Sequence, residues 1–246
     1  MKTAMPNETG PPAMPDAGGG YARQHTSGES RDLGHVIRRS QGAAGNALGS
    51  SSQEAGAVPG SAQSGRLTEE LLASLVHALG ARSILDLGLE SGASALAMAE
   101  AAPEGADVHA CSPGAGDLGR VHEALEQARH GDRIILLSQD PMAALTAAHE
   151  PYDLVRLALG TGVGAVSDAV ARQIVRTLLD RGLLSARGLL VVHDVLLPRE
   201  IGEGDDPAEA GEHSSADFND WLSGEQRLRQ VMLPMGGGVT IARLAP

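Results

Sequence analysis

The segment from Ser83 to Ser94, with the sequence SILDLGLESGAS, constrains the fold more than any other part of the chain. Its first half is an apolar run of strand length, and its second half is an acidic turn with two glycines that opens a helix. Gly88 can adopt a positive φ at the turn, and Gly92 lets a ligand approach the N–H groups at the start of the helix. The pattern predicts an α/β domain that holds a nucleotide-like cofactor. The alternative is a glycine pair that only packs helices.

The spacing of this motif narrows the choice of cofactor. Dinucleotide-binding folds favour Gly-x-Gly-x-x-Gly, whereas this turn reads Asp-x-Gly-x-x-x-Gly with Asp86 leading. An acid beside the ligand suits a cationic group, and S-adenosylmethionine (SAM) carries both an ammonium and a sulfonium. A nicotinamide-dependent reductase is less well supported, because the close glycine pair is missing and no acid ends the second apolar run to hold a ribose.

The first 65 residues differ in composition from the rest of the 246-residue chain. Residues 1–65 are rich in Gly, Ser, Ala, Pro and Gln and show no sustained apolar periodicity. Such a segment buries too little apolar surface to offset the entropy of ordering. We therefore expect a disordered arm over residues 1–65 and one folded domain over residues 66–246.

Charge and hydropathy exclude several classes of partner. The formal net charge is -12, and no window concentrates Lys and Arg as a nucleic-acid interface requires. No window approaches the roughly 20 apolar residues that span a bilayer, and the N-terminus lacks the apolar core of a signal peptide. The only cysteine, Cys111, cannot form an internal disulfide and is expected in the core. We expect a cytoplasmic protein that acts on a small molecule and binds neither nucleic acid nor a membrane.

From residue 67 onward, short apolar runs alternate with helical patterns. Helices are expected at 67–79, 92–101, 117–129, 140–148, 165–182 and 214–223. Strands are expected at 84–87, 108–111, 134–137, 154–157, 189–192, 228–233 and 239–244. The last two strands flank a glycine turn and predict a hairpin. The alternation predicts an α/β, Rossmann-like fold: a seven-stranded, mostly parallel sheet with helices on both faces and a C-terminal antiparallel hairpin.

Four segments resemble motifs of class I SAM-dependent methyltransferases, and most closely the catechol-type O-methyltransferases of bacteria, in particular their actinobacterial branch. The resemblance extends over residues 67–244 and is carried by LGARSILDLG (79–88), YDLV (152–155), GLLVVHDVL (188–196) and LPMGGGVT (233–240). It implies SAM as cofactor, with Gly88 and Gly92 near its methionine part. It also implies that Asp86 fixes the ammonium and that Ser94 offers a hydroxyl.

Several positions depart from the family pattern. The second strand normally ends in an acid that holds the ribose, whereas here it is followed by Ser112, which offers a single hydroxyl. The acid near the adenine is replaced by Gln139, or by Asp140 with a shift. The fourth strand in the family ends in an Asp-rich turn followed by lysine, whereas this chain has Ala158 and neither group. From the resemblance we therefore expect Ser112, Gln139 and Ala158 to contact the cofactor in place of the residues that the family usually has there.

His193 and Asp194 follow the fifth expected strand, where metal-using members of the family place Asp-Asn. One His and one Asp provide too few oxygen ligands for Mg²⁺, so we expect no catalytic metal. Methyl transfer needs mainly alignment, and a base helps when the acceptor is a hydroxyl. His193 is the expected base, and Asp194 is expected to orient a water or the substrate. The alternative is a histidine that only closes a strand end.

Two functions follow from these observations and both stay open. The first is a metal-independent, SAM-dependent O-methyltransferase for a small hydroxylated molecule. The second is a degenerate, non-catalytic methyltransferase fold that acts as a binding or regulatory partner, because the ribose acid, the metal ligand and the lysine are missing. The resemblance implies a homodimer that pairs through the early helices, for which the apolar stripe over residues 67–79 offers a surface; burial of the same stripe against the sheet is the alternative.

Overall fold

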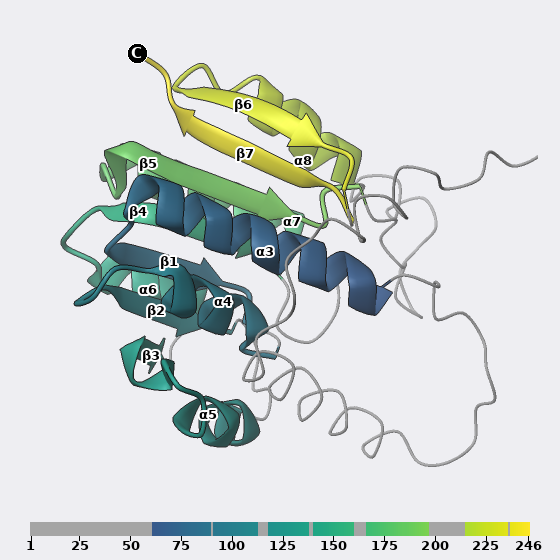
Figure 1. Ribbon diagram of the computed structural model, residues 1–246. Coiled ribbons are helices and arrows are strands. Elements are labelled where there is room, and N and C mark those ends of the chain that lie inside the picture. The colour runs from purple at the N-terminus through teal and green to yellow at the C-terminus, as the bar shows by residue number, and fades with distance from the viewer. Residues whose placement is uncertain are drawn as a thin grey trace, which may run out of the picture.

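The computed structural model describes residues 61–89, 91–112, 118–137, 140–159, 166–196, 215–235 and 237–246. Within these residues the chain forms a seven-stranded sheet with helices packed on both faces (Figure 1). The expected arm lies outside the described residues up to residue 60. The first described helix, α3 (Ser61–Leu79), begins ahead of the domain boundary expected near residue 65.

The strands follow the spatial order β3-β2-β1-β4-β5-β7-β6. Strands β1 to β5 pair in parallel, and β7 is antiparallel to both β5 and β6. Their bounds are Ser83–Leu87 (β1), Asp107–Cys111 (β2), Ile134–Leu137 (β3), Tyr152–Ala158 (β4), Leu184–His193 (β5), Leu228–Leu233 (β6) and Val239–Leu244 (β7). The central strands are almost wholly apolar because helices cover both of their faces.

Two buried apolar clusters fix the helix layers. Helices α3, α4 (Ala93–Ala101) and α5 (Leu118–Glu126) contribute to the cluster on one face of the sheet. Helices α6 (Pro141–Ala147), α7 (Asp168–Asp180) and α8 (Ser215–Ser223) contribute to the cluster on the other face. A short 3-10 helix, Gly131–Arg133, precedes β3. Because strands β1 to β5 run in parallel between these helix layers, their carboxyl ends all lie along one edge of the sheet.

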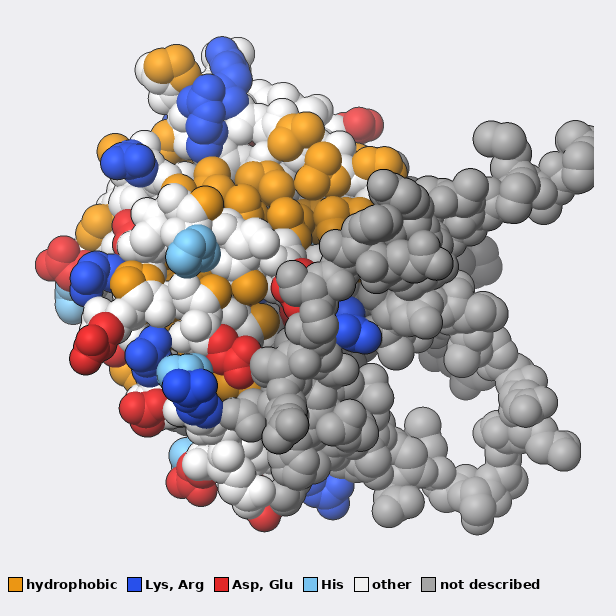
Figure 2. Space-filling view, in the orientation of Figure 1, with side chains coloured by type: hydrophobic (Ala, Val, Ile, Leu, Met, Phe, Trp, Pro, Cys, Tyr) orange, Lys and Arg blue, Asp and Glu red, His pale blue; other side chains and the backbone are white. Residues whose placement is uncertain are grey.

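The apolar stripe of α3 packs within the chain. Leu72 and Val76 are completely buried and belong to the cluster that contains the sheet residues Ile84 and Leu154. The surface of the β6–β7 hairpin differs, because hydrophobic side chains gather there beside α3 (Figure 2). Val231 on β6 is 53% exposed. The exposed apolar area thus lies on the hairpin more than on α3.

The expected fold class is confirmed, including the terminal hairpin and the single strand that runs against the others. The main difference in bounds is β5, which extends back to Leu184. Leu184 pairs with Tyr152, and Leu189 pairs with Leu154, so the residues between them form a bulge. That bulge carries the polar sequence SARG, which shows no strand periodicity. None of the described helices has the length and apolar character needed to cross a membrane.

Candidate active site

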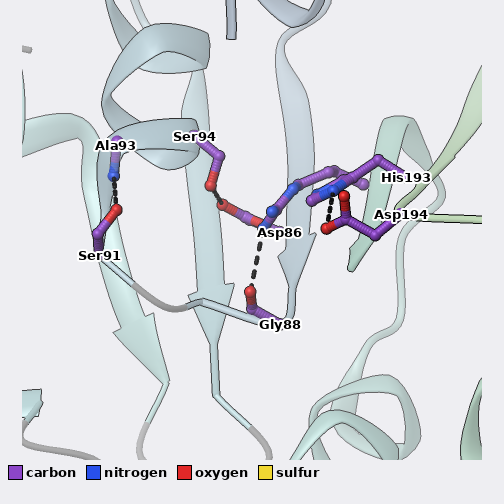
Figure 3. Close-up of polar contacts among 8 residues, drawn as sticks. Asp86, Gly88, Ser91, Ala93, Ser94, His193 and Asp194 are labelled. Carbon is purple, nitrogen blue, oxygen red and sulfur yellow. Dashed lines mark hydrogen bonds and ion pairs between the residues drawn. The ribbon is translucent and has the colours of Figure 1, made fainter. Parts of the chain in front are cut away.

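The carboxyl ends of β1, β4 and β5 meet at one place in the sheet. Asp86 on β1 is the register partner of Arg156 on β4, and Ala158 on β4 is the partner of His193 on β5. Side chains two residues apart on a strand share a face, so Asp86, Arg156 and His193 lie on the same face of the sheet. Figure 3 shows Asp86 with Ser94 on one side of this site, and His193 with Asp194 on the other.

Asp86 lies next to the last residue of β1 and is completely buried. Arg156 Nη1 donates to its Oδ1 at 2.6 Å, and the Ser94 hydroxyl donates to its Oδ2 at 2.7 Å. Both carboxylate oxygens therefore already accept hydrogen bonds from the protein. Asp86 joins strand β1 to strand β4 and to the first turn of α4.

Arg156 is a residue of the site that the sequence analysis missed. Its side chain is nearly buried in the central strand β4, and Nη1 also donates to the carbonyl oxygen of Gly88 at 3.1 Å. The signal was an arginine inside the otherwise apolar run Leu154 to Ala158. A buried arginine needs a charged partner, so its position alone pointed to a carboxylate on a neighbouring strand.

Two glycines shape the turn after β1. Gly88 has φ 102° and Gly92 has φ 82°, in the range that favours glycine. The N–H groups of Gly88 and Leu89 donate to the carbonyl of Cys111, which holds the turn over the end of β2. Gly92 caps α4 without any side-chain hydrogen bond, although Ser91 Oγ accepts from the N–H of Ala93 at 3.3 Å. The turn thus lies at the carboxyl edge of the sheet, with Gly88 and Gly92 buried in it.

Gly92 also allows α5 to pack closely. A Cβ atom on Gly92 would lie 3.1 Å from Val121 Cγ1 and 3.3 Å from Leu125 Cδ2. The helix-packing interpretation of this glycine therefore has a structural basis, and it does not conflict with a role in the turn.

Replacing Gly92 with alanine is expected to lower the free energy of unfolding by about 2 kcal/mol, because it combines an unfavourable φ with a tight contact. Gly80 is the matched control, since its φ is 60° and a Cβ there would meet nothing within 4 Å. The Gly80→Ala protein should lose only about 1 kcal/mol. Urea unfolding measures both values, and equal losses would mean that contact with α5 adds no cost.

His193 and Asp194 form a hydrogen-bonded pair at the end of β5. His193 Nδ1 lies 3.0 Å from Asp194 Oδ2. An ionised carboxylate only accepts, so Nδ1 carries the proton and Nε2 is left as an acceptor. Nε2 is buried and meets no hydrogen-bond partner among the described residues. Such an orphaned atom costs about 1–3 kcal/mol, so it points to a partner that binds there.

The charge state of His193 is set by its surroundings. Burial lowers the pKa of the imidazole below its ordinary value, and the nearby Arg156 guanidinium lowers it further. The hydrogen bond and charge of Asp194 and the charge of Asp86 act in the opposite direction. The net effect favours the neutral imidazole, which is the form that accepts a proton.

Asp194 has φ 63° and is the one non-glycine residue with a positive φ among the residues described. The segment after it is firmly held, because the N–H groups of Val195 and Leu196 donate to carbonyls of the β6–β7 turn. Asn219 on α8 donates to the carbonyl of Val195 at 2.8 Å. Unusual backbone that is held in this way is common at functional sites, and here it orients the side chain that bonds His193.

The other expected site residues lie nearby or outside the described part. Ser112 directly follows β2 and is buried, and Ala158 is the last residue of β4 and is buried. Gln139 lies outside the described residues. Asp140 caps α6, where its Oδ1 accepts from the N–H of Ala143 at 2.9 Å. In the described ranges, no group of three or more His, Cys, Asp or Glu side chains could hold a metal ion.

Comparisons with known proteins identify a family and a shared fold. The O-methyltransferase family model matches residues 60–245 of this chain. No curated protein sequence matches the chain. Among solved structures, the SAH-bound methyltransferase PaMTH1 of Podospora anserina is similar over 100% of both chains, with 20% sequence identity and a TM-score of 0.71.

Two bacterial structures are similar at comparable levels. The O-methyltransferase TomG of Streptomyces achromogenes, involved in tomaymycin synthesis and solved in complex with SAM, is 18% identical with a TM-score of 0.63. The similarity covers 92% of this chain and 95% of TomG. An O-methyltransferase of Bacillus cereus in complex with SAH is 16% identical with a TM-score of 0.62, over 93% of this chain and 97% of that one. At these identities the structures show a shared fold.

Proposed function

This chain belongs to the O-methyltransferase family, and from this premise we propose that it transfers a methyl group from SAM to a hydroxyl of a small molecule. The observation that carries the catalytic part is the buried, orphaned Nε2 of His193 beside the turn after β1. The hydroxyl of the substrate that accepts the methyl group can donate a hydrogen bond to this nitrogen. When bound, SAM supplies a methyl group on a positively charged sulfur.

The turn after β1 fits such a cofactor. Gly88 and Gly92 form the turn at the carboxyl edge of the sheet, and Gly92, which has no side chain, caps the start of α4. Asp86 can contact an ammonium only by sharing oxygens that already bond Arg156 and Ser94, and each oxygen has a second lone pair for this. The same proposal places Ser112 near the ribose, Gln139 near the adenine, and Ala158 at the wall of the site.

The proposed roles of His193 and Asp194 follow from their hydrogen bond. Asp194 fixes the imidazole with its proton on Nδ1, so Nε2 faces the acceptor as a base. Removal of the acceptor proton makes its oxygen a better nucleophile, and the alignment of this oxygen with the methyl group supplies much of the remaining rate. The residues of the site therefore act by positioning and by moving one proton.

We expect this reaction to need no metal, because Ala158 and His193 replace the oxygen ligands that Mg²⁺ prefers. Methyl transfer from labelled SAM to a panel of phenols and catechols tests the proposal. Product formation should be equal with EDTA and with added Mg²⁺. Rates that depend on Mg²⁺, together with micromolar Mg²⁺ binding that Asp194→Ala removes, would contradict metal independence. The lack of any product from the panel would count against the proposed substrate class.

A homodimer is part of this proposal, and the exposed apolar surface of the β6–β7 hairpin supports it. Val231 on β6 and Ile241 on β7 are register partners and lie on the same face. Hydrophobic side chains gather on the surface of the hairpin (Figure 2). Burying such a surface against a second copy would be favourable. Light scattering should give a dimer mass for the wild type and a monomer mass for Val231→Lys. A monomeric wild type would exclude the dimer.

The cellular setting in this proposal is the cytoplasm, and the substrate class is small molecules. Cys111 is buried and free, as expected where thiols stay reduced. The formal charge of -12 disfavours nucleic acid as a substrate. Fractionation of cells that express the chain would test the location. Recovery of the protein in the membrane fraction alone would contradict a cytoplasmic location.

A further inference from the structure

Arg156 occupies an unusual place for a charged side chain. Strand β4 is the central strand of the seven, and Leu154, Val155 and Leu157 around Arg156 are completely buried. Arg156 itself is 6% exposed. A guanidinium at such a depth has a large desolvation cost, so its position requires compensating contacts.

Those contacts all lead to the turn after β1. Nη1 of Arg156 donates to Asp86 Oδ1 and to the carbonyl of Gly88, and the second oxygen of Asp86 accepts from Ser94. One chain of hydrogen bonds therefore runs from β4 through β1 to the glycine turn and to α4. Removal of Arg156 would release the Gly88 carbonyl and leave the Asp86 carboxylate buried without a cation.

Arg156 also faces His193. The register places Arg156 opposite Val191 and Ala158 opposite His193, so Arg156 and His193 are diagonal neighbours on one face of adjacent parallel strands. The charged groups that act on His193 come from three strands: Arg156 on β4, Asp86 on β1, and Asp194 next to His193 at the end of β5. Arg156 is the one cation among these three and the one that opposes protonation of the imidazole.

We propose that Arg156 is a positioning residue that ties the turn after β1 to the base on β5. It holds the backbone of the turn through Gly88 and Asp86, and from its diagonal position on β4 its charge adds to the effect of burial in disfavouring the protonated form of His193. A single side chain thus prepares both the cofactor site and the acceptor site. This inference rests on the proposed function for its catalytic meaning, whereas its effect on His193 is measurable without any cofactor.

The test is an NMR titration of the His193 imidazole in the cofactor-free protein, combined with calorimetric titration of SAM. In Arg156→Met, the titration midpoint of His193 should move to higher pH by roughly half a unit or more, and SAM should bind about tenfold more weakly. Arg156→Lys keeps the cation and should leave the midpoint near that of the wild type. A purely structural arginine would not distinguish these two variants in this way.

Two further variants serve as a control and as a fallback in this titration. Arg187 is exposed on β5, so Arg187→Met is the matched control and should change neither readout. If Arg156→Met does not fold, the double variant Asp86→Asn with Arg156→Met removes both charges of the ion pair and leaves neither buried alone. The titration midpoint of His193 should still rise in this variant, because Arg156 acts on His193 more strongly than Asp86 does. An unchanged midpoint in these variants would overturn the inference. Failure of the wild type to bind SAM would instead refute the proposed function and leave the titration result readable.

Discussion

Replacement of His193 by glutamine is expected to lower the rate of methyl transfer roughly 10²–10⁴-fold, the range typical for loss of a general base. Glutamine is polar and of similar length, yet it cannot take a proton from the acceptor. The proposed cofactor site lies at the turn after β1, whereas His193 lies at the end of β5, so the affinity for SAM should change little. Steady-state rates with the best acceptor from the phenol panel, together with calorimetry of SAM binding, measure the two effects.

Two variants sharpen this result. His77 is exposed in the last turn of α3, which leads into the start of β1 and not its carboxyl end, so His77→Gln should keep the wild-type rate. Asp194→Asn keeps a residue type that tolerates a positive φ, but it no longer fixes the proton on Nδ1 of His193. Its rate should fall about tenfold or more. A His193→Gln protein with an unchanged rate would show that His193 only closes the strand end.

The lowered pKa of His193 gives the pH dependence its sign. In the proposed mechanism the neutral imidazole is the active form, so the rate should stay at its plateau at the ordinary histidine pKa of about 6.5 and fall only at lower pH. Stability follows the same direction. The unfolded chain binds the proton more readily, so a part of the folding free energy present above about pH 6.5 is lost as pH falls through the lowered pKa. His193→Gln should remove that loss in urea unfolding at pH 7.5 and 5.5.

Asp86→Asn is the second substitution with a large expected effect, and it should reduce the free energy of unfolding by about 3–5 kcal/mol. It leaves the buried Arg156 guanidinium without a counter-charge, in a pair whose atoms lie 2.6 Å apart and whose side chains are at most 8% exposed. Combining Asp86→Asn with Arg156→Met removes both charges, and most of the lost stability should return. Urea unfolding of the wild type, both single variants and the double variant gives the coupling between the two residues.

An exposed ion pair serves as the control for this cycle. Arg227 and Asp180 lie 2.7 Å apart, but their side chains are 46% and 65% exposed. Asp180→Asn should therefore cost less than about 1 kcal/mol. If Asp86→Asn costs no more than Asp180→Asn, the buried pair does not hold β1 to β4. A double variant as unstable as the sum of the single variants would point to independent roles.

Much of this fold could be predicted because each element carries a local signal. Buried parallel strands are nearly continuous apolar runs, and glycine turns mark their ends. Strands 134–137, 228–233 and 239–244 begin and end at the expected residues. The early part of β5 could not be predicted, since its bulge breaks the alternation that identifies a strand.

The site was predictable in part for a different reason. Asp86, Gly88 and Gly92 are neighbours in sequence, so their spacing defines a turn. Arg156 lies 70 residues from Asp86, and its role depends on the register between β1 and β4, which no local pattern encodes. The orphaned Nε2 of His193 likewise follows from packing around β5 and is visible only in three dimensions.

Calorimetric titration of the purified protein with SAM tests the central claim most directly, with SAH and NADH titrated in parallel. We expect micromolar binding of SAM and SAH and no binding of NADH. We also expect loss of binding in Gly88→Val, because a branched side chain at φ 102° would distort the turn after β1. Absence of SAM binding up to millimolar concentration, in a sample shown to be folded, would contradict the proposed methyltransferase function and indicate a non-catalytic member of the family.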